Sequence, residues 1–195
     1  MDYRLDKINL LKTLQTWSGF LKRKVHLIAC GGTALTLLGI KESTKDVDFL
    51  VPNESEYEYL IKILDQLGYV QVTTSGWGRK GEPYLFDLFR GKRIHTTELL
   101  NSPLEPGKNT LIREFSTLYI GVLNHYDLIA SKLFRGTSVD FEDCLSLLKT
   151  RWHEIDLKKM ESHFFELAAF DIAEERIKKH WEHFLTLIKK EKFNA

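Results

Sequence analysis

A strand that ends at two adjacent glycines constrains the fold of this chain more than any other feature. The apolar run Val25–Ala29 is followed by Cys30, Gly31, Gly32 and Thr33, and then by a short stretch that favours helix. The run is rich in β-forming residues and predicts a buried strand. A strand that continues as a helix at Gly-Gly turns backbone N–H groups outward, which suits a phosphate. The Thr33 hydroxyl can either cap the helix or bond a phosphate oxygen.

Two aspartates follow shortly after this corner. In a strand that begins near Asp46, the side chains of Asp46 and Asp48 share one face, while Val47 and Phe49 share the other. Mg²⁺ prefers oxygen ligands and takes one or two carboxylates together with substrate phosphates. The pattern therefore predicts a magnesium–triphosphate site. The alternative is that Gly-Gly is a plain turn and that the aspartates mark a solvated strand end.

The order of these motifs carries a resemblance. The sequence Gly-Gly-Thr-Ala-Leu at residues 31–35, followed by Asp-Val-Asp-Phe at residues 46–49, resembles the nucleotidyltransferase superfamily, which includes DNA polymerase beta and aminoglycoside nucleotidyltransferases. Within it, the chain looks most like the bacterial branch that contains the toxins of abortive-infection toxin–antitoxin pairs. This resemblance implies an α/β (α+β) fold, in which helices flank a mixed β-sheet, and two Mg²⁺ ions held by three carboxylates.

The third carboxylate is expected at Asp87. This residue is the single charge in the apolar run Tyr84–Phe89, which predicts another strand. A carboxylate in such a strand is costly to bury unless it is paired or bound to a metal. The resemblance implies that a neighbouring strand supplies the third metal ligand, and Asp87 matches that position. The alternative is an ion pair with Arg90 or Arg93.

A lysine and two acidic residues lie in the helical part of the sequence. In the branch that the chain resembles, a helix with a lysine returns to the active site and an acidic pair opens the next helix; Lys132, Asp140 and Asp143 match this pattern. Lys132 would neutralise triphosphate charge, and the alternative is a solvated lysine. The two aspartates either pair with Lys132 or Arg135, or favour the helix N-terminus electrostatically.

The rest of the chain divides into two regions. Residues 1–123 predict a nucleotidyltransferase-like α/β domain, and residues 124–195 predict a C-terminal helical region packed on it. Residues 75–81 contain three glycines and two cations and are expected to form a loop, either a hairpin connection or a basic flap near the triphosphate. Residues 91–114 appear irregular apart from a short strand near 93–95. The other expected elements are a helix over 5–21, a helix capped by Asn53, and strands over 69–73 and 118–122.

Composition excludes several classes of protein. With 43% hydrophobic and 28% charged residues the chain has the composition of a soluble protein. A formal net charge of +1 excludes a strongly basic nucleic-acid binder on bulk grounds, although a local basic groove remains open. The two cysteines, Cys30 and Cys144, are too few for a disulfide framework and are expected to be reduced core residues. No run of membrane-spanning length is present, so no membrane partner is expected and the expected compartment is the cytoplasm.

The resemblance and the motifs together predict an enzyme. It would transfer a nucleoside monophosphate from an NTP to a hydroxyl acceptor, such as a tRNA or a protein, and release pyrophosphate. Asp46 and Asp48 would bridge both Mg²⁺ ions, and Asp87 would hold the ion that activates the attacking oxygen. The residues expected to bind the nucleotide are Gly31, Gly32, Thr33 and Lys132. Two alternatives stay open: a non-catalytic nucleotide-binding or protein-interaction module with the same fold, and a toxin whose biology is set by an antitoxin protein.

Overall fold

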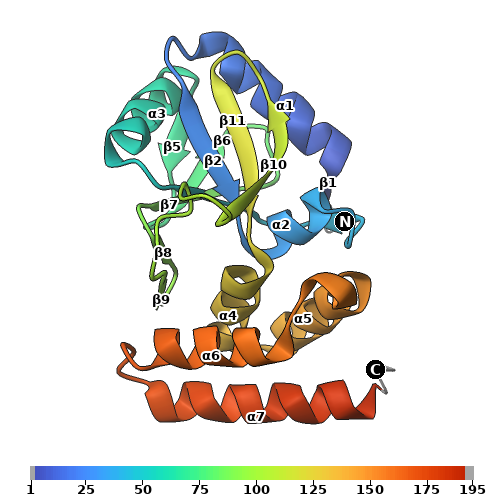
Figure 1. The fold of residues 1–195 in the computed structure, drawn as a ribbon. Helices are drawn as coiled ribbons and strands as arrows, with labels where there is room; N and C mark the ends of the chain where they lie inside the picture. The colour runs from blue at the N-terminus through green and yellow to red at the C-terminus, as the bar shows by residue number, and fades with distance from the viewer. Residues whose placement is uncertain (1–2, 192–195) are drawn as a thin grey trace. The chain divides into compact units, whose positions relative to one another are not determined.

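A computed structural model describes residues 3–191, and the chain divides into two compact units (Figure 1). The first, here called the α/β unit, runs through Ile94 and resumes over Asn101–Asn124. The second, the helical unit, takes His95–Leu100 and the chain from His125 onward. The division expected from the sequence lies one residue earlier and does not include the excursion at 95–100.

The α/β unit is built on a mixed sheet of seven strands in the order β10-β11-β2-β4-β7-β6-β5. The central strand β4 runs parallel to β7 and antiparallel to β2, and β2 runs parallel to β11. The strands are β2 (Val25–Ala29), β4 (Val47–Val51), β5 (Tyr69–Gln71), β6 (Gly76–Arg79), β7 (Phe86–Arg90), β10 (Asn109–Glu114) and β11 (Leu118–Leu123). Short strands β1 (Leu5–Asp6) and β3 (Ser43–Thr44) pair with each other, and β8 spans Arg93–Ile94.

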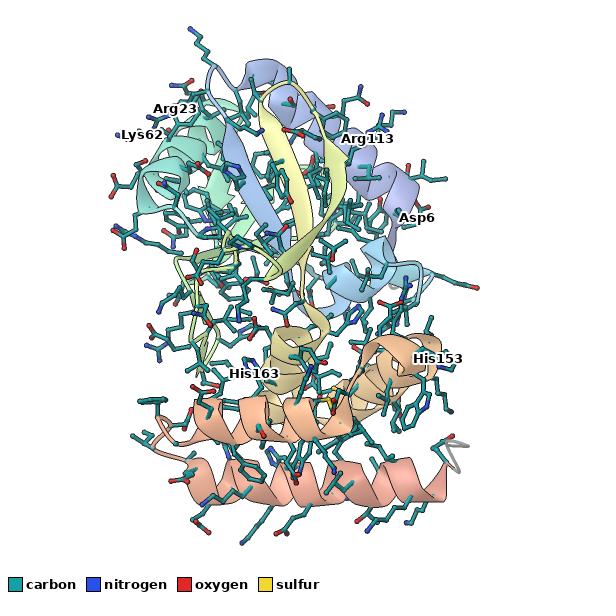
Figure 2. All side chains as sticks on the ribbon, in the orientation of Figure 1. Asp6, Arg23, Lys62, Arg113, His153 and His163 are labelled. Atoms are coloured by element: carbon teal, nitrogen blue, oxygen red, sulfur yellow. The ribbon has the colours of Figure 1, made fainter. Side chains whose placement is uncertain are left out.

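Three helices flank this sheet: α1 (Lys7–Phe20), α2 (Gly31–Leu37) and α3 (Glu54–Gln66) (Figure 1). The expected fold class, a mixed sheet flanked by helices, is thus confirmed. As expected, Asn53 caps α3, and its side chain accepts hydrogen bonds from the backbone N–H groups of Ser55 and Glu56. Asp6, labelled in Figure 2, caps α1 in the same way by accepting from Asn9 N at 2.8 Å.

Helix α1 packs one apolar row of side chains against the sheet. Leu10, Leu14 and Trp17 are buried, and the Trp17 ring lies 4.3 Å from the Phe86 ring between centroids. Ile8, near the start of the helix, is exposed. Two overlapping apolar rows occur in this sequence, and tertiary packing selects the row that contains Leu10, Leu14 and Trp17.

The prediction of a loop over residues 75–81 is wrong, because Gly76–Arg79 form β6, which pairs with β5 and β7. A Cβ atom on Gly76 would lie 2.5 Å from Thr73 Oγ1, and one on Gly78 would lie 2.7 Å from Leu85 Cδ2. These glycines therefore admit neighbouring side chains inside a strand, and they do not mark a flexible loop. Strand β10 was also missed, because it is an edge strand whose side chains are mostly exposed or half-buried.

The helical unit contains α4 (His125–Arg135), α5 (Ser138–Thr150), α6 (Leu157–Ala168) and α7 (Glu174–Lys190), with a 3₁₀ turn at Trp152–Glu154 and the short strand β9 (Thr97–Glu98). Its core includes the stacked rings of Phe164 and Trp181, with centroids 5.1 Å apart. His163 of α6, labelled in Figure 2, contacts the buried Asp127 of α4 with 2.7 Å between Nε2 and Oδ1. Over residues 3–191, no helix is both long and apolar enough to cross a membrane.

Candidate active site

The two glycines of the corner form the first turn of α2 and do not precede it as a loop. Gly31 has a φ of +57°, in the left-handed region that favours glycine, and a Cβ atom there would lie 2.3 Å from Asp48 Oδ2. A Cβ atom on Gly32 would lie 2.9 Å from Thr44 Oγ1. Both positions therefore let the backbone pass close to polar side chains, and at Gly31 that side chain is a predicted metal ligand.

Thr33 joins the start of α2 to the start of β4. Its side chain is fully buried, and its hydroxyl donates to the carbonyl oxygen of Asp46 at 3.1 Å and accepts from Asp48 N at 2.9 Å. The Thr44 hydroxyl donates to the same Asp46 oxygen at 2.7 Å. Because the Thr33 hydroxyl already donates one hydrogen bond and accepts another, a phosphate contact at this residue would come from its backbone N–H.

The register of the sheet places two of the predicted carboxylates opposite each other. Asp48 on β4 pairs with Asp87 on the parallel strand β7, so their side chains leave the same face of the sheet. Asp48 is 8% exposed and Asp87 is half-buried. Asp46 precedes β4 and is exposed. The sheet thus brings Asp48 and Asp87 side by side, and Asp46 lies two residues before Asp48 in the sequence.

Asp87 is held by a neutral hydroxyl and not by an arginine. Ser75 Oγ donates to Asp87 Oδ1 at 2.6 Å. Arg90, one of the two expected alternative partners, forms ion pairs with Glu54 and Glu58 on α3. Ser75 was not predicted from the sequence, since its position beside Asp87 depends on the pairing of β6 with β7.

The donors suit a hard cation, but they are not gathered into a preformed cage. Carboxylate oxygens are the ligands that Mg²⁺ prefers, and the missing side chain of Gly31 lets the backbone of α2 lie close to the carboxylate of Asp48. Across the described residues, no group of three or more His, Cys, Asp or Glu side chains is arranged to hold a metal ion. Carboxylates repel one another, so register alone does not draw the three together. The residues fit the ion by chemistry, and the three-carboxylate metal site stays a prediction.

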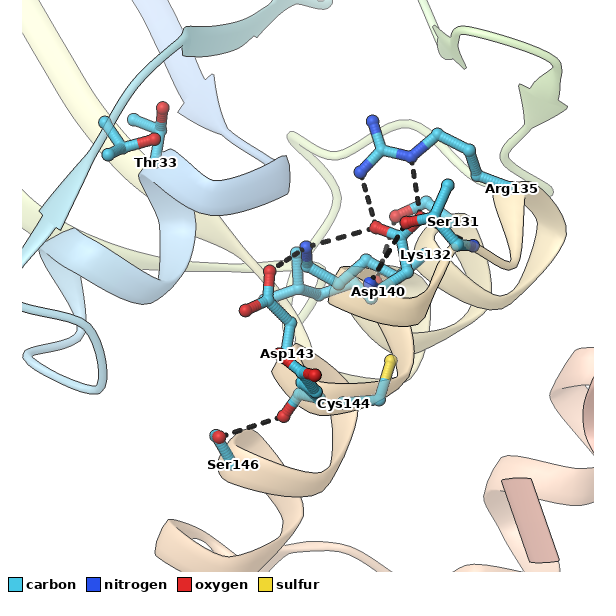
Figure 3. Close-up of polar contacts among 12 residues, drawn as sticks. Thr33, Ser131, Lys132, Arg135, Asp140, Asp143, Cys144 and Ser146 are labelled. Atoms are coloured by element: carbon cyan, nitrogen blue, oxygen red, sulfur yellow. Dashed lines mark hydrogen bonds and ion pairs between the residues drawn. The ribbon is translucent and has the colours of Figure 1, made fainter. Parts of the chain in front are cut away.

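Lys132 lies in the helical unit, within a charge cluster defined by Lys132, Arg135, Asp140 and Asp143 (Figure 3). The lysine is 2% exposed, and its Nζ lies 2.6 Å from Asp143 Oδ2 and 3.6 Å from Asp140 Oδ1. Arg135 binds the second aspartate, Asp140, through both Nε and Nη2. The alternative of a solvated lysine is wrong, whereas the expected ion pairs of Asp140 and Asp143 are confirmed. A phosphate role for Lys132 stays a prediction.

The environment of Asp140 within this charge cluster favours its ionised form. Burial alone would raise the pKa of Asp140, but hydrogen bonds from Arg135 and Thr137, with the nearby charges, outweigh it and hold that pKa below its ordinary value. The Thr137 contact belongs to a capping box at the start of α5, in which Asp140 is the reciprocal partner. Close by, burial raises the pKa of the Cys144 thiol. Cys30 and Cys144 are both buried and unbridged, as expected.

The sequence family described as a nucleotidyltransferase of unknown function (DUF6036) matches residues 9–192, which is nearly the whole chain. The chain belongs to this family. No curated protein matches this nucleotidyltransferase.

Solved structures of ANT(2″)-Ia share the fold of this nucleotidyltransferase. A crystal structure in complex with adenylyl-2″-tobramycin is 15% identical and aligns with a TM-score of 0.56, covering 84% of this chain and 97% of the other. A solution structure of the same protein is also 15% identical with a TM-score of 0.56, and it covers 92% of this chain and 100% of the other. At this identity the likeness establishes the fold, and the family match establishes the enzyme class.

Proposed function

We propose that this nucleotidyltransferase moves a nucleoside monophosphate from Mg²⁺–NTP to a hydroxyl acceptor and releases pyrophosphate. The observation that carries the proposal is the pairing of Asp48 with Asp87 on parallel strands, beside a glycine whose missing side chain lets the backbone of α2 lie close to the carboxylate of Asp48. The family match and the shared fold support the same reaction class.

Each residue of the site has a role in this proposal. Asp46, Asp48 and Asp87 would hold Mg²⁺, which supplies positive charge to the attacking and leaving oxygens when it is bound. Backbone N–H groups at Gly31 and Gly32, in the first turn of α2, would bind the phosphates. The buried Thr33 hydroxyl fixes the segment from Asp46 to Asp48. Lys132 would neutralise triphosphate charge, a role that rests on the resemblance alone. Its ion pairs would have to rearrange for that role.

The proposal also specifies the class of acceptor and a regulatory partner protein. The crystallised ANT(2″)-Ia complex contains adenylyl-2″-tobramycin, so the fold accommodates a small-molecule product in that protein. For the present chain we propose a tRNA or a protein hydroxyl as acceptor and an antitoxin protein as regulator. Both follow from the resemblance of residues 31–35 and 46–49 to the toxin branch.

A labelling experiment tests the reaction and the acceptor together. The purified protein would be incubated with Mg²⁺, each α-³²P-labelled NTP in turn, and either total tRNA, total cell protein or tobramycin. We expect transfer of label to tRNA or protein by the wild type and loss of transfer in Asp48→Asn. Asp65→Asn, which changes an exposed aspartate of α3, is the matched control and should behave as the wild type.

The other outcomes also decide between the alternatives. Label on tobramycin alone would replace the macromolecular acceptor by a small molecule. Binding of Mg²⁺–NTP without transfer to any acceptor would favour the non-catalytic module. Absence of both binding and transfer would overturn the proposed function.

A further inference from the structure

The turn between β5 and β6 is held by its own hydrogen bonds. Val72 N donates to the carbonyl oxygen of Gly76 at 2.8 Å, and Gly76 N donates to Thr73 Oγ1 at 2.8 Å. Neither bond involves the Ser75 side chain. The turn is therefore closed without the Ser75 hydroxyl, so that hydroxyl can bond to a residue outside the turn.

Ser75 is instead directed to β7 by two contacts. Its carbonyl oxygen accepts from Leu88 N at 2.8 Å, which fixes the backbone of Ser75 beside β7. Its hydroxyl donates to Asp87 Oδ1 at 2.6 Å. This distance is typical of a hydroxyl that donates to an ionised carboxylate. Such a backbone anchor orients the donor before any ligand arrives.

The hydrogen bond occupies one of the two carboxylate oxygens. Over residues 3–191, Oδ2 of Asp87 accepts no hydrogen bond, so Ser75 supplies the carboxylate with one neutral donor and leaves the second oxygen available. A Cβ atom on Gly76 would lie 3.5 Å from Oδ1, which is ordinary contact, so the backbone of β6 closes the same side. The carboxylate is thus fixed from the β6 side, and its register partner on the other side is Asp48.

We propose that Ser75 is a positioning residue for divalent-cation binding by Asp87. It holds Oδ1 so that Oδ2 is kept for a cation shared with Asp48. Partners of this kind orient metal ligands, and their loss weakens metal affinity. The inference rests on the proposed function, and it adds a residue that neither the motifs nor the resemblance indicated.

Three variants separate this role from closure of the turn. Ser75→Ala removes the hydroxyl that reaches Asp87, and Ser75→Thr keeps it. Thr73→Ala is the matched control, because it removes a hydroxyl from the same turn that serves Gly76 N and does not contact Asp87. The affinity for Mn²⁺ alone would be measured by electron paramagnetic resonance, from the loss of the free-ion signal. Melting temperatures would be recorded for every variant.

We expect Ser75→Ala to weaken Mn²⁺ binding by roughly tenfold, with Ser75→Thr and Thr73→Ala close to the wild type. In an Asp87→Asn background, the Ser75→Ala change should have no further effect. If Ser75→Ala does not fold, Ser75→Cys takes its place, since a thiol is a similar size and only a weak donor.

Two results would overturn the inference while leaving the proposed function intact: unchanged Mn²⁺ affinity in Ser75→Ala, or an equal loss in Thr73→Ala. Failure of the wild type to bind Mn²⁺ and to transfer a nucleotide would instead remove the proposed function, and the role of Ser75 with it.

Discussion

The carboxylates of the two units have different partners. In the helical unit, Asp140 and Asp143 are paired with Arg135 and Lys132, so each aspartate lies beside a cationic side chain. In the α/β unit, Asp87 is held by the neutral hydroxyl of Ser75. Loss of one partner from a buried ion pair is strongly destabilising, so we expect the charge cluster of the helical unit to support the fold. We expect Asp87, whose partner is a neutral hydroxyl, to be the carboxylate that binds metal.

Removal of Asp87 should have the largest effect on activity. In Asp87→Ala, transfer of nucleotide should fall by about a thousandfold or more, because the carboxylate expected to hold the ion at the attacking oxygen is lost. NTP binding should persist, since the phosphates and the two remaining carboxylates can still bind Mg²⁺. Transfer and NTP affinity would be measured on the same preparation. Glu58→Ala, which removes an exposed partner of Arg90, is the control; transfer by Asp87→Ala at the wild-type rate would exclude its role.

Removal of Asp140 should have the largest effect on stability. Asp140→Ala would leave Arg135 and the buried Lys132 short of a counter-charge and would delete the capping box of α5. Breaking a buried pair in this way costs about 3–5 kcal/mol of unfolding free energy. Urea denaturation measures the loss, and Glu142→Ala, an exposed carboxylate on the same helix, should change little. Equal stability of the two variants would show that the ion pairs of Asp140 contribute nothing to the free energy of unfolding.

Gly31 allows the site to be perturbed with a matched backbone control. Gly31→Ala and Gly39→Ala both place alanine at positive φ, +57° and +75°, but only the first puts a Cβ atom against Asp48, since nothing lies within 4 Å of the position on Gly39. Each should lose about 1–3 kcal/mol from backbone strain. Only Gly31→Ala should also weaken Mn²⁺ binding, which calorimetry can measure. The same Mn²⁺ affinity in both variants would mean that the approach of Gly31 to Asp48 serves packing alone.

The smallest expected effect is on the acid stability of the helical unit. The folded pKa of Asp140 lies below its unfolded value of about 3.9. Its ionised form therefore stabilises the fold at pH values above about 3.9, and this contribution is lost as the pH falls through the lower folded pKa. Unfolding free energies above and below about pH 4 should differ more in the wild type than in Asp140→Asn. Identical pH dependence in the two proteins would contradict the assignment.

The sequence predicted those parts of the molecule that depend on local chemistry. The strand at Val25–Ala29, the strand that carries Asp48 and the Asn53 cap all follow from apolar periodicity and capping residues near in sequence. The pairing of Asp48 with Asp87 agrees with the expected neighbouring strands.

The misses depend on contacts between distant residues. Gly76–Arg79 were assigned to a loop because their glycines look flexible, and the side chains of Thr73 and Leu85 packed against Gly76 and Gly78 explain these glycines. The Thr33 hydroxyl was assigned to a helix cap or a phosphate, and its bonds to β4 depend on how α2 packs on that strand. Lys132 was given a solvated alternative because its two partners lie on the next helix. Tertiary partners decide such roles, and local patterns do not contain them.

The placement of the two cysteines has a practical consequence. Cys30 lies in the α/β unit and Cys144 in the helical unit, and both are fully buried thiols in a chain that contains no other cysteine. A thiol reagent can reach either one only when the surrounding structure opens. The labelling rate of Cys30 in a Cys144→Ala variant, and of Cys144 in a Cys30→Ala variant, would therefore report the opening of each unit separately. Nucleotide and metal that bind the α/β unit alone would slow the first rate and leave the second unchanged.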